Sequence, residues 1–146
     1  MSQAVDCTPS HLVERFYNAV WNQSDEAAAR QILHPNVAFT GSLKRTVVGI
    51  EHFLVYLRSV HAALADYSCE IQDLIATETR VAVRMRFRGV HRGIFFGVPA
   101  TGKFIEWAGA AFFTVHQSVI TEIWVLGDVD AIKQQLGLGA VAPFDS

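Results

Sequence analysis

The strict alternation of residues in the segment 80–90, RVAVRMRFRGV, constrains the fold more than any other feature. Successive side chains of an extended chain point to opposite faces, so a period of two residues predicts a β-strand. One face of this strand would be apolar and the other basic. The apolar face carries Val81, Val83, Met85 and Phe87, and the other face carries Ala82, Arg84, Arg86 and Arg88.

The segments around this strand have strand character too. We expect strands over 67–76, 104–115 and 119–127, and a shorter one over 36–40. Polar residues at 78–79 predict a tight turn between the strands over 67–76 and 80–90, and polar residues at 116–118 predict another between the strands over 104–115 and 119–127. Residues 91–103, HRGIFFGVPATGK, are rich in glycine and predict a longer connection. The second half of the chain is therefore expected to form a sheet of antiparallel hairpins.

Three helices are predicted ahead of these strands. The first begins near Pro9 and places Leu12, Phe16 and Val20 at helical spacing. The second, DEAAARQIL, is capped near Asp25, and the third covers IEHFLVYLRSVHAAL after Gly49. Helices followed by strands favour an α+β fold, in which three N-terminal helices cover one face of a curved antiparallel sheet. Such a cone-shaped arrangement has a mouth suited to a small molecule.

Length and composition set further limits. The chain has 146 residues, of which 51% are hydrophobic, so we expect one domain over 10–137, with a leader over 1–9 and a tail over 138–146. A net charge of −2 argues against a nucleic-acid partner. We see no signal peptide and no apolar run of about 18 residues, so no membrane span is expected. Cys7 and Cys69 form no CxxC motif and predict free thiols in a cytoplasmic protein.

The last predicted strand carries candidate catalytic groups. Counting by two along VITEIWVLGD places Glu122, Trp124 and Asp128 on one face with Ile120. Both faces of this run are largely apolar, so we expect the two carboxylates in or beside a dry interior. A buried carboxylate without a fixed cation has a raised pKa and suits general acid–base chemistry. Two structural alternatives are an ion pair between Glu122 and a neighbouring arginine and an N-cap role for Asp128.

Aromatic residues supply the remaining candidates. Tyr17 and Trp21 share one face of the first helix, where Tyr17 could donate its hydroxyl to an enolate oxygen or both could simply fill the core. Trp124 would form a wall for a planar substrate, or fill the core itself. Phe39 and Phe112 are expected to contact substrate as well. His91 could orient substrate near the mouth, although a loop histidine is often structural. No histidine spacing predicts a metal site.

Several motifs together resemble a known family. The runs GVHRGIFFGVPATGKFIEWAG and ITEIWVLGDVDAIKQQLG, with ERFYNAVWNQSD near the start, resemble the SnoaL-like polyketide cyclases of the NTF2-like superfamily over about residues 10–137. The resemblance implies a cone-shaped α+β barrel, a homodimer and no metal or organic cofactor. It also implies an intramolecular aldol ring closure with Asp128 as acid and base. The chain departs from the family at three positions. Members often carry an acidic or polar residue where this chain has Val125, a histidine where it has Ile123, and a polar ring residue or arginine where it has Thr114.

Three functions remain open from the sequence. The first is cofactor-free proton transfer or cyclisation on a small apolar carbonyl compound, with Asp128 as base and Tyr17 or His91 stabilising the oxyanion. The second is an epoxide hydrolase-like enzyme, which would need a cluster of acids and an arginine around a water molecule. The third is a non-catalytic, dimeric module that binds a small ligand, and it predicts that Asp128 only caps a helix.

Overall fold

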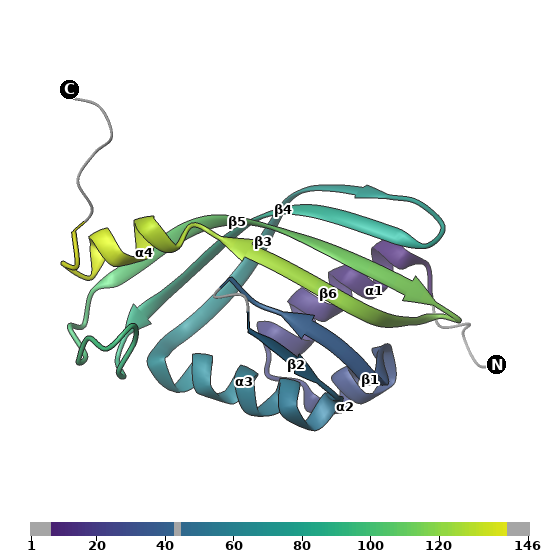
Figure 1. Ribbon diagram of the computed structural model, residues 1–146, viewed down its shortest axis with the longest axis horizontal. Helices are drawn as coiled ribbons and strands as arrows, with labels where there is room; N and C mark the ends of the chain where they lie inside the picture. Colours follow the sequence, from purple (N-terminus) through teal and green to yellow (C-terminus); the bar gives the residue numbers. More distant parts are fainter. Residues whose placement is uncertain (1–6, 43–44, 140–146) are drawn as a thin grey trace.

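Four α-helices and one π-helical segment occur in the part of the chain that the structure describes (Figure 1). The computed structural model describes residues 7–42 and 45–139. The helical elements are α1 (Pro9–Arg15), η1 (Phe16–Trp21), α2 (Glu26–Ile32), α3 (Ile50–Ala63) and α4 (Val129–Gln135). The three expected N-terminal helical regions are therefore confirmed, the first of them as α1 continued by η1.

The strands form one six-stranded sheet in the order β2-β1-β6-β5-β4-β3. Four of the five strand pairs are antiparallel, and β1 and β6 run parallel. The expected antiparallel sheet is thus confirmed apart from this pair, which the sequence pattern did not predict. The strands are β1 (Leu33–Thr40), β2 (Thr46–Val48), β3 (Leu64–Ala76), β4 (Arg80–His91), β5 (Phe104–His116) and β6 (Val119–Gly127).

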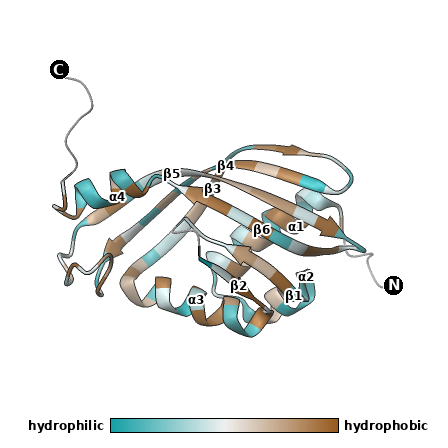
Figure 2. Ribbon diagram, viewed as in Figure 1, coloured by the Kyte–Doolittle hydropathy of each residue, from teal (hydrophilic) through white to brown (hydrophobic). Residues whose placement is uncertain are grey.

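The sheet is curved, and α1, α2 and α3 lie beneath it, against its inner face (Figure 1). Apolar residues recur along the strands and on these helices (Figure 2). Phe16 and Phe113 are fully buried where the first helical region meets β5, and their ring centroids lie 5.5 Å apart. The core therefore fills the space between the helices and the inner face of the sheet, and the α+β prediction is confirmed.

The first helical region widens where it reaches the core. Pro9 occupies the first turn of α1, where its missing N–H costs nothing. From Phe16 the chain is π-helical, and the N–H of Asn22 donates to the carbonyl of Tyr17 at 2.9 Å. Single π-helical turns often lie at functional sites because the extra residue changes where side chains point. Here the wide turn carries both Tyr17 and Trp21.

A β-bulge in β6 changes which face of the sheet each residue of this strand lies on. Thr114 of β5 pairs with Glu122, whereas the next residue, Val115, pairs with Ile120. Thr121 is therefore an extra residue on β6, and the alternation shifts by one position at this point. Ile120 and Ile123 are both buried, whereas Glu122 is exposed. The prediction that Ile120 shares a face with Glu122 is wrong for this reason.

The remaining boundaries agree closely with expectation. The short strand β2 was not expected from the sequence, and it pairs with β1 from Ala38 to Thr40. The strands β1 and β3 each begin three residues earlier than predicted, directly after a helix. The leader 1–9 and the tail 138–146 lie mostly outside the described residues. No helix within the described ranges is long and apolar enough to cross a membrane.

Candidate functional site

A cavity of about 590 Å³ lies between α3 and the inner face of the sheet. This volume is within the range of small-molecule sites, roughly 300–1,000 Å³. Its wall is dominated by aromatic side chains from η1, β1, α3, β3, β4, β5 and the loop after β4. They are Phe16, Tyr17, Trp21, Phe39, Tyr56, Tyr67, Phe87, Phe95, Phe96 and Trp107.

Tyr17 lines this cavity, and its hydroxyl is buried within the wall. The side chain is 1% exposed, and its oxygen is buried without a hydrogen-bond partner in the described structure. Burial raises the pKa of the phenol well above its usual value, and the nearby Cys69 raises it further. Tyr17 therefore stays protonated and has an unused O–H to donate. A buried donor without a partner costs free energy, which a ligand oxygen would recover.

Tyr67 and Cys69, both on β3, contribute two further polar groups to the wall. The Tyr67 hydroxyl donates to the Cys69 sulphur, and burial raises the pKa of the phenol well above its usual value. Burial also raises the pKa of the Cys69 thiol to about 12, although the bond from Tyr67 opposes the shift. Both groups are neutral at physiological pH. Cys69 is thus an inert part of the wall and not a reactive thiolate.

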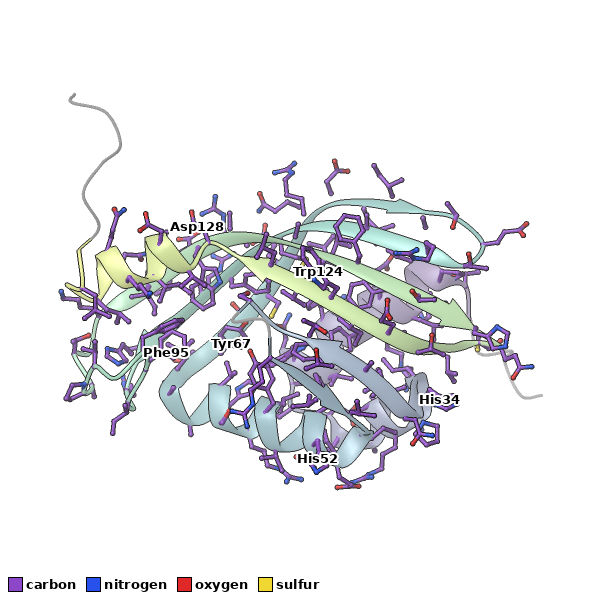
Figure 3. All side chains as sticks on the ribbon, viewed as in Figure 1. His34, His52, Tyr67, Phe95, Trp124 and Asp128 are labelled. Carbon is purple, nitrogen blue, oxygen red and sulfur yellow. The ribbon has the colours of Figure 1, made fainter. Side chains whose placement is uncertain are left out.

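Two basic side chains of the wall are open to solvent. Arg45 and His52 line the cavity and are exposed. The Nδ1 atom of His52 lies 2.9 Å from the carbonyl of Val48, and a carbonyl can only accept, so Nδ1 carries a proton. In the neutral ring, Nε2 is then an unprotonated acceptor. His52 lies on the lower edge of the molecule, on α3 (Figure 3).

Gly127 brings β6 close to the cavity. Its N–H donates to the hydroxyl of Ser42 at 2.7 Å, and a Cβ at this position would lie 3.1 Å from Nε1 of Trp107. A larger residue would therefore require Ser42 or Trp107 to move by a few tenths of an ångström. Ser42 and Trp107 both line the wall, and the glycine lets them approach β6 closely.

Three of the predicted site residues line the cavity. Tyr17 and Trp21 come from η1, and Phe39 comes from β1. Trp21 is 4% exposed and stacks with His61, whose Nε2 is 2.9 Å from the Trp21 carbonyl. The structure therefore brings these three side chains to the same small-molecule cavity.

Three other predicted residues lie on the opposite, outer face of the sheet. Trp124 is 41% exposed and Phe112 is 44% exposed, and their rings contact each other with centroids 5.8 Å apart. Glu122 is exposed on the same strand as Trp124. Their expected positions inside the cone are wrong, because Ile123 and Val125 take the inner positions of β6. No ion pair of Glu122 with an arginine occurs among the described residues.

Asp128 lies at the N-terminus of α4 (Figure 3). Its Oδ1 accepts a hydrogen bond of 3.0 Å from the N–H of Ala131, and the residue is exposed. Val129 and Ile132 of the same helix line the cavity, but Asp128 is not among the described residues of its wall. The alternative of an N-cap role is what the geometry shows.

His91 is fully buried at the base of the loop after β4. Its Nε2 lies 3.1 Å from the carbonyl of Val98, and its Nδ1 accepts from the N–H of Thr101 at 3.3 Å. Both ring nitrogens are thus used by the loop, and His91 does not line the cavity. Its ring lies beside Phe95, with centroids 6.5 Å apart. His91 therefore holds the loop that carries Phe95 and Phe96.

Several lining residues were not singled out from the sequence. Tyr67 and Trp107 lie in strands whose sequence alternates, and a large aromatic residue on the apolar face could have indicated that they line the cavity. Phe95 and Phe96 lie in a loop whose two adjacent phenylalanines are unusual for a solvated connection. His52 and Arg45 gave no signal, because a single exposed histidine or arginine has no distinctive spacing.

A second groove, of about 550 Å³, lies on the far side of Cys69. Its polar groups are largely committed to the protein, because Arg88 pairs with Glu70, and Asn22 exchanges hydrogen bonds with the backbone of Cys69. In the described ranges, no three His, Cys, Asp or Glu side chains are grouped so that they could hold a metal ion. The aromatic cavity is therefore the better candidate site.

Comparisons with known proteins agree with this arrangement. The family model described as SnoaL-like polyketide cyclase matches residues 11–136. A candidate SnoaL-like polyketide cyclase from Jannaschia sp. CCS1 is similar in structure, with a TM-score of 0.83 and 17% identity over 96% of this chain and 100% of that one. IdmH, a candidate polyketide cyclase from Streptomyces antibioticus, has a TM-score of 0.78 and 25% identity over 88% and 98%.

A protein described as another kind of enzyme has a similar fold. AclR from Streptomyces galilaeus, a candidate hydroxylase, has a TM-score of 0.77 and 22% identity over 92% of this chain and 83% of that one. The fold therefore does not fix the reaction. The comparison with curated protein sequences gave no match. Because the family model covers most of the chain, the protein belongs to the SnoaL-like polyketide cyclase family.

Proposed function

We propose that the protein binds a flat, largely apolar carbonyl compound in the aromatic cavity and promotes its enolisation. The observation that carries this proposal is the Tyr17 hydroxyl, which is buried, protonated and without a hydrogen-bond partner among the described residues. A carbonyl oxygen placed against it would accept its hydrogen bond. The bond would strengthen as negative charge develops on that oxygen, which is how an oxyanion donor lowers a reaction barrier.

The base in this proposal is His52. Its Nε2 is the unprotonated acceptor of the neutral ring, since the Val48 carbonyl holds the proton on Nδ1. Among the described residues that line the cavity there is no aspartate or glutamate. Val125 lines the wall at the position where other members of the family often carry an acid. A histidine is the remaining side chain there with the usual chemistry of a general base.

The proposed step requires no reactant other than the ligand and these two residues. Nε2 of His52 takes a proton from the carbon beside the carbonyl. The electrons of that C–H bond form a carbon–carbon double bond, and the carbonyl electrons move to the oxygen held by Tyr17. In a ligand with a second carbonyl, the enolate carbon would attack it and close a ring, and the imidazolium would return its proton to the new alkoxide. This is the aldol closure that the family description implies.

The test is exchange of the α-protons of 2-tetralone, a small aromatic ketone, followed by NMR in deuterated buffer. We expect the wild-type protein to accelerate exchange above the buffer rate, and Tyr17→Phe and His52→Gln each to slow it by about tenfold or more. Asp128→Asn is the matched control and should leave the rate unchanged. No acceleration by the wild-type protein, or loss of exchange only in Asp128→Asn, would contradict the assignment.

A second candidate function is ligand binding without catalysis. The absence of a carboxylate from the described part of the wall favours it. It predicts that 2-tetralone binds in the cavity with no enhanced exchange. An epoxide hydrolase-like reaction has less support, because the described wall holds one arginine, Arg45, and no acid beside it.

We further propose that the protein is a homodimer in the cytoplasm and acts without a metal or organic cofactor. Support for the dimer comes from the outer face of the sheet. Phe112, Trp124 and Leu126 are between 41% and 49% exposed and neighbour one another on β5 and β6. An adjoining apolar group of this kind marks an interaction surface. The free thiols of Cys7 and Cys69 suit a reducing compartment.

A further inference from the structure

The loop after β4 contains a tight turn of unusual composition. Phe95 and Val98 exchange two backbone hydrogen bonds, of 3.1 and 2.9 Å, around the two residues between them. Those residues, Phe96 and Gly97, have φ angles of 50° and 75°. Two successive positive φ angles define a type I′ turn, a geometry that normally uses asparagine, aspartate or glycine at both positions.

Phe96 is therefore held in a strained backbone conformation. A bulky side chain in the left-handed region is uncommon, because its Cβ crowds the following carbonyl. Such strain persists only where the surroundings fix the conformation, and strained residues cluster at ligand-binding sites.

The surroundings of the turn account for its persistence. Phe95 packs edge to face against Phe96, with centroids 4.8 Å apart, and lies 6.3 Å from the ring of Trp107. His91 accepts from the backbone of Thr101, and its Nε2 lies 3.1 Å from the Val98 carbonyl. The turn is thus fixed at its base by a buried histidine and on its inner side by an aromatic cluster. Phe95 lies at the same end of the molecule as Tyr67 (Figure 3).

Phe96 itself faces the cavity. It lines the wall and is only partly buried, and Ile94 beside it is 74% exposed. Its ring packs against the edge of the core but is not fully buried, and an asparagine would suit the backbone of the turn better. We propose that Phe96 is a specificity-determining residue, whose ring is held at the cavity mouth to stack on a flat aromatic ring of the ligand. This proposal rests on the proposed function, and it names aromatic over saturated carbonyl compounds as the ligand class.

The test compares two ketones and two strained turns. The probes are 9-fluorenone, which is flat and aromatic, and 1-decalone, which is saturated, with affinities measured by quenching of tryptophan fluorescence or by calorimetry. We expect the wild-type protein to prefer 9-fluorenone. Phe96→Asn should raise the melting temperature, because the strain is relieved, and should reduce that preference by about tenfold.

The matched control is Gln117→Asn. Gln117 and Ser118 form the turn between β5 and β6 and have φ angles of 48° and 65°, so the same strain occurs in a turn that does not line the cavity. This variant should gain stability and keep the ligand preference. Phe96→Leu removes the ring, but leucine lacks the short polar side chain that lets asparagine adopt a positive φ, so this variant should lose the preference without the gain in melting temperature.

The outcomes separate the two proposals. If Phe96→Asn keeps the preference for 9-fluorenone, or is no more stable than the wild-type protein, the role of Phe96 is wrong while ligand binding stands. If the wild-type protein binds neither ketone, the proposed function fails and the inference fails with it.

Discussion

The ring of Tyr17 packs edge to face against Phe113, with centroids 5.9 Å apart and planes at 89°. Phe113 is fully buried on the inner face of β5. The contact fixes the ring of Tyr17 by packing alone and leaves its hydroxyl free of any partner among the described residues. A rigid ring with an unused donor is prepared for a ligand before the ligand arrives, which reduces the cost of ordering the site on binding.

Stability should fall at alkaline pH because of Cys69. Its pKa is raised to about 12 by burial, from an ordinary value near 9. Between these values the unfolded chain loses a proton that the folded protein keeps. The free energy of unfolding should therefore be unaffected below about pH 9 and decrease above it, by up to about 1.4 kcal/mol per pH unit. Urea unfolding of the wild-type protein and Cys69→Ala from pH 7 to 10.5 measures the difference.

In the Cys69→Ala variant the decrease should be smaller, although Tyr17 and Tyr67 still contribute at higher pH because their pKa values are raised too. Equal slopes for the two proteins above pH 9 would show that the thiol ionises as readily in the folded protein as in the unfolded chain.

Asp128 should act as a helix cap. Asp128→Ala should lower the free energy of unfolding by about 1 kcal/mol, because the N–H of Ala131 loses its acceptor, and Asp128→Ser should restore most of it. Asp25→Ala is the matched control, since Asp25 caps α2 through Ala28 in the same way. Ligand affinity should be unchanged in all three variants. A loss of α-proton exchange in both Asp128 variants but not in Asp25→Ala would return the catalytic role to Asp128.

His91 should stabilise the loop after β4. His91→Leu removes the partners of the Val98 carbonyl and the Thr101 N–H, and a buried group left unpaired costs about 1–3 kcal/mol. We expect faster proteolysis within residues 92–103 and weaker binding of 9-fluorenone. The matched variant is His61→Leu. The ring of His61 contacts Trp21 and not the loop, so this variant should leave the loop protected from proteolysis. Unchanged proteolysis in His91→Leu would contradict the role of His91.

The outer face should mediate self-association. Trp124→Glu places a charge in the centre of the apolar group around Phe112 and should convert a dimer to a monomer in light scattering after size exclusion. Val48→Glu changes an exposed apolar residue of the edge strand β2 and should leave the dimer intact. A wild-type protein that is monomeric at high concentration would contradict this use of the face.

The sequence predicted the fold well because its strands alternate and its helices are amphipathic. Segment 80–90 shows period two over its whole length, and it forms β4 with the apolar residues inward. Which residues of β6 lie on the inner face could not be predicted in the same way, because both of its faces are apolar and the bulge at Thr121 shifts the alternation. Trp124 was therefore assigned to the interior, although it lies outside.

The site was predicted in part. Tyr17 and Trp21 were found through their spacing on the first helix, which survives in the π-helical turn. The sequence does not indicate Phe96, because its proposed role depends on a backbone conformation, and GIFFGVP does not show which residue takes the positive φ. The sequence does not indicate His52 either, because its proposed role as base depends on its tautomer, and the Val48 carbonyl that fixes the tautomer is brought to it only by the fold.

The measurement that tests the central claim most directly compares 9-fluorenone with fluorene, which lacks the carbonyl, in the wild-type protein and Tyr17→Phe. We expect the wild-type protein to bind 9-fluorenone about tenfold tighter than fluorene, a difference of about 1.4 kcal/mol, and Tyr17→Phe to bind the two equally. The variant should be at least as stable as the wild-type protein, since it loses an unpaired buried hydroxyl. An unchanged preference for the ketone in a folded Tyr17→Phe variant would contradict the claim that this hydroxyl binds the ligand's oxygen.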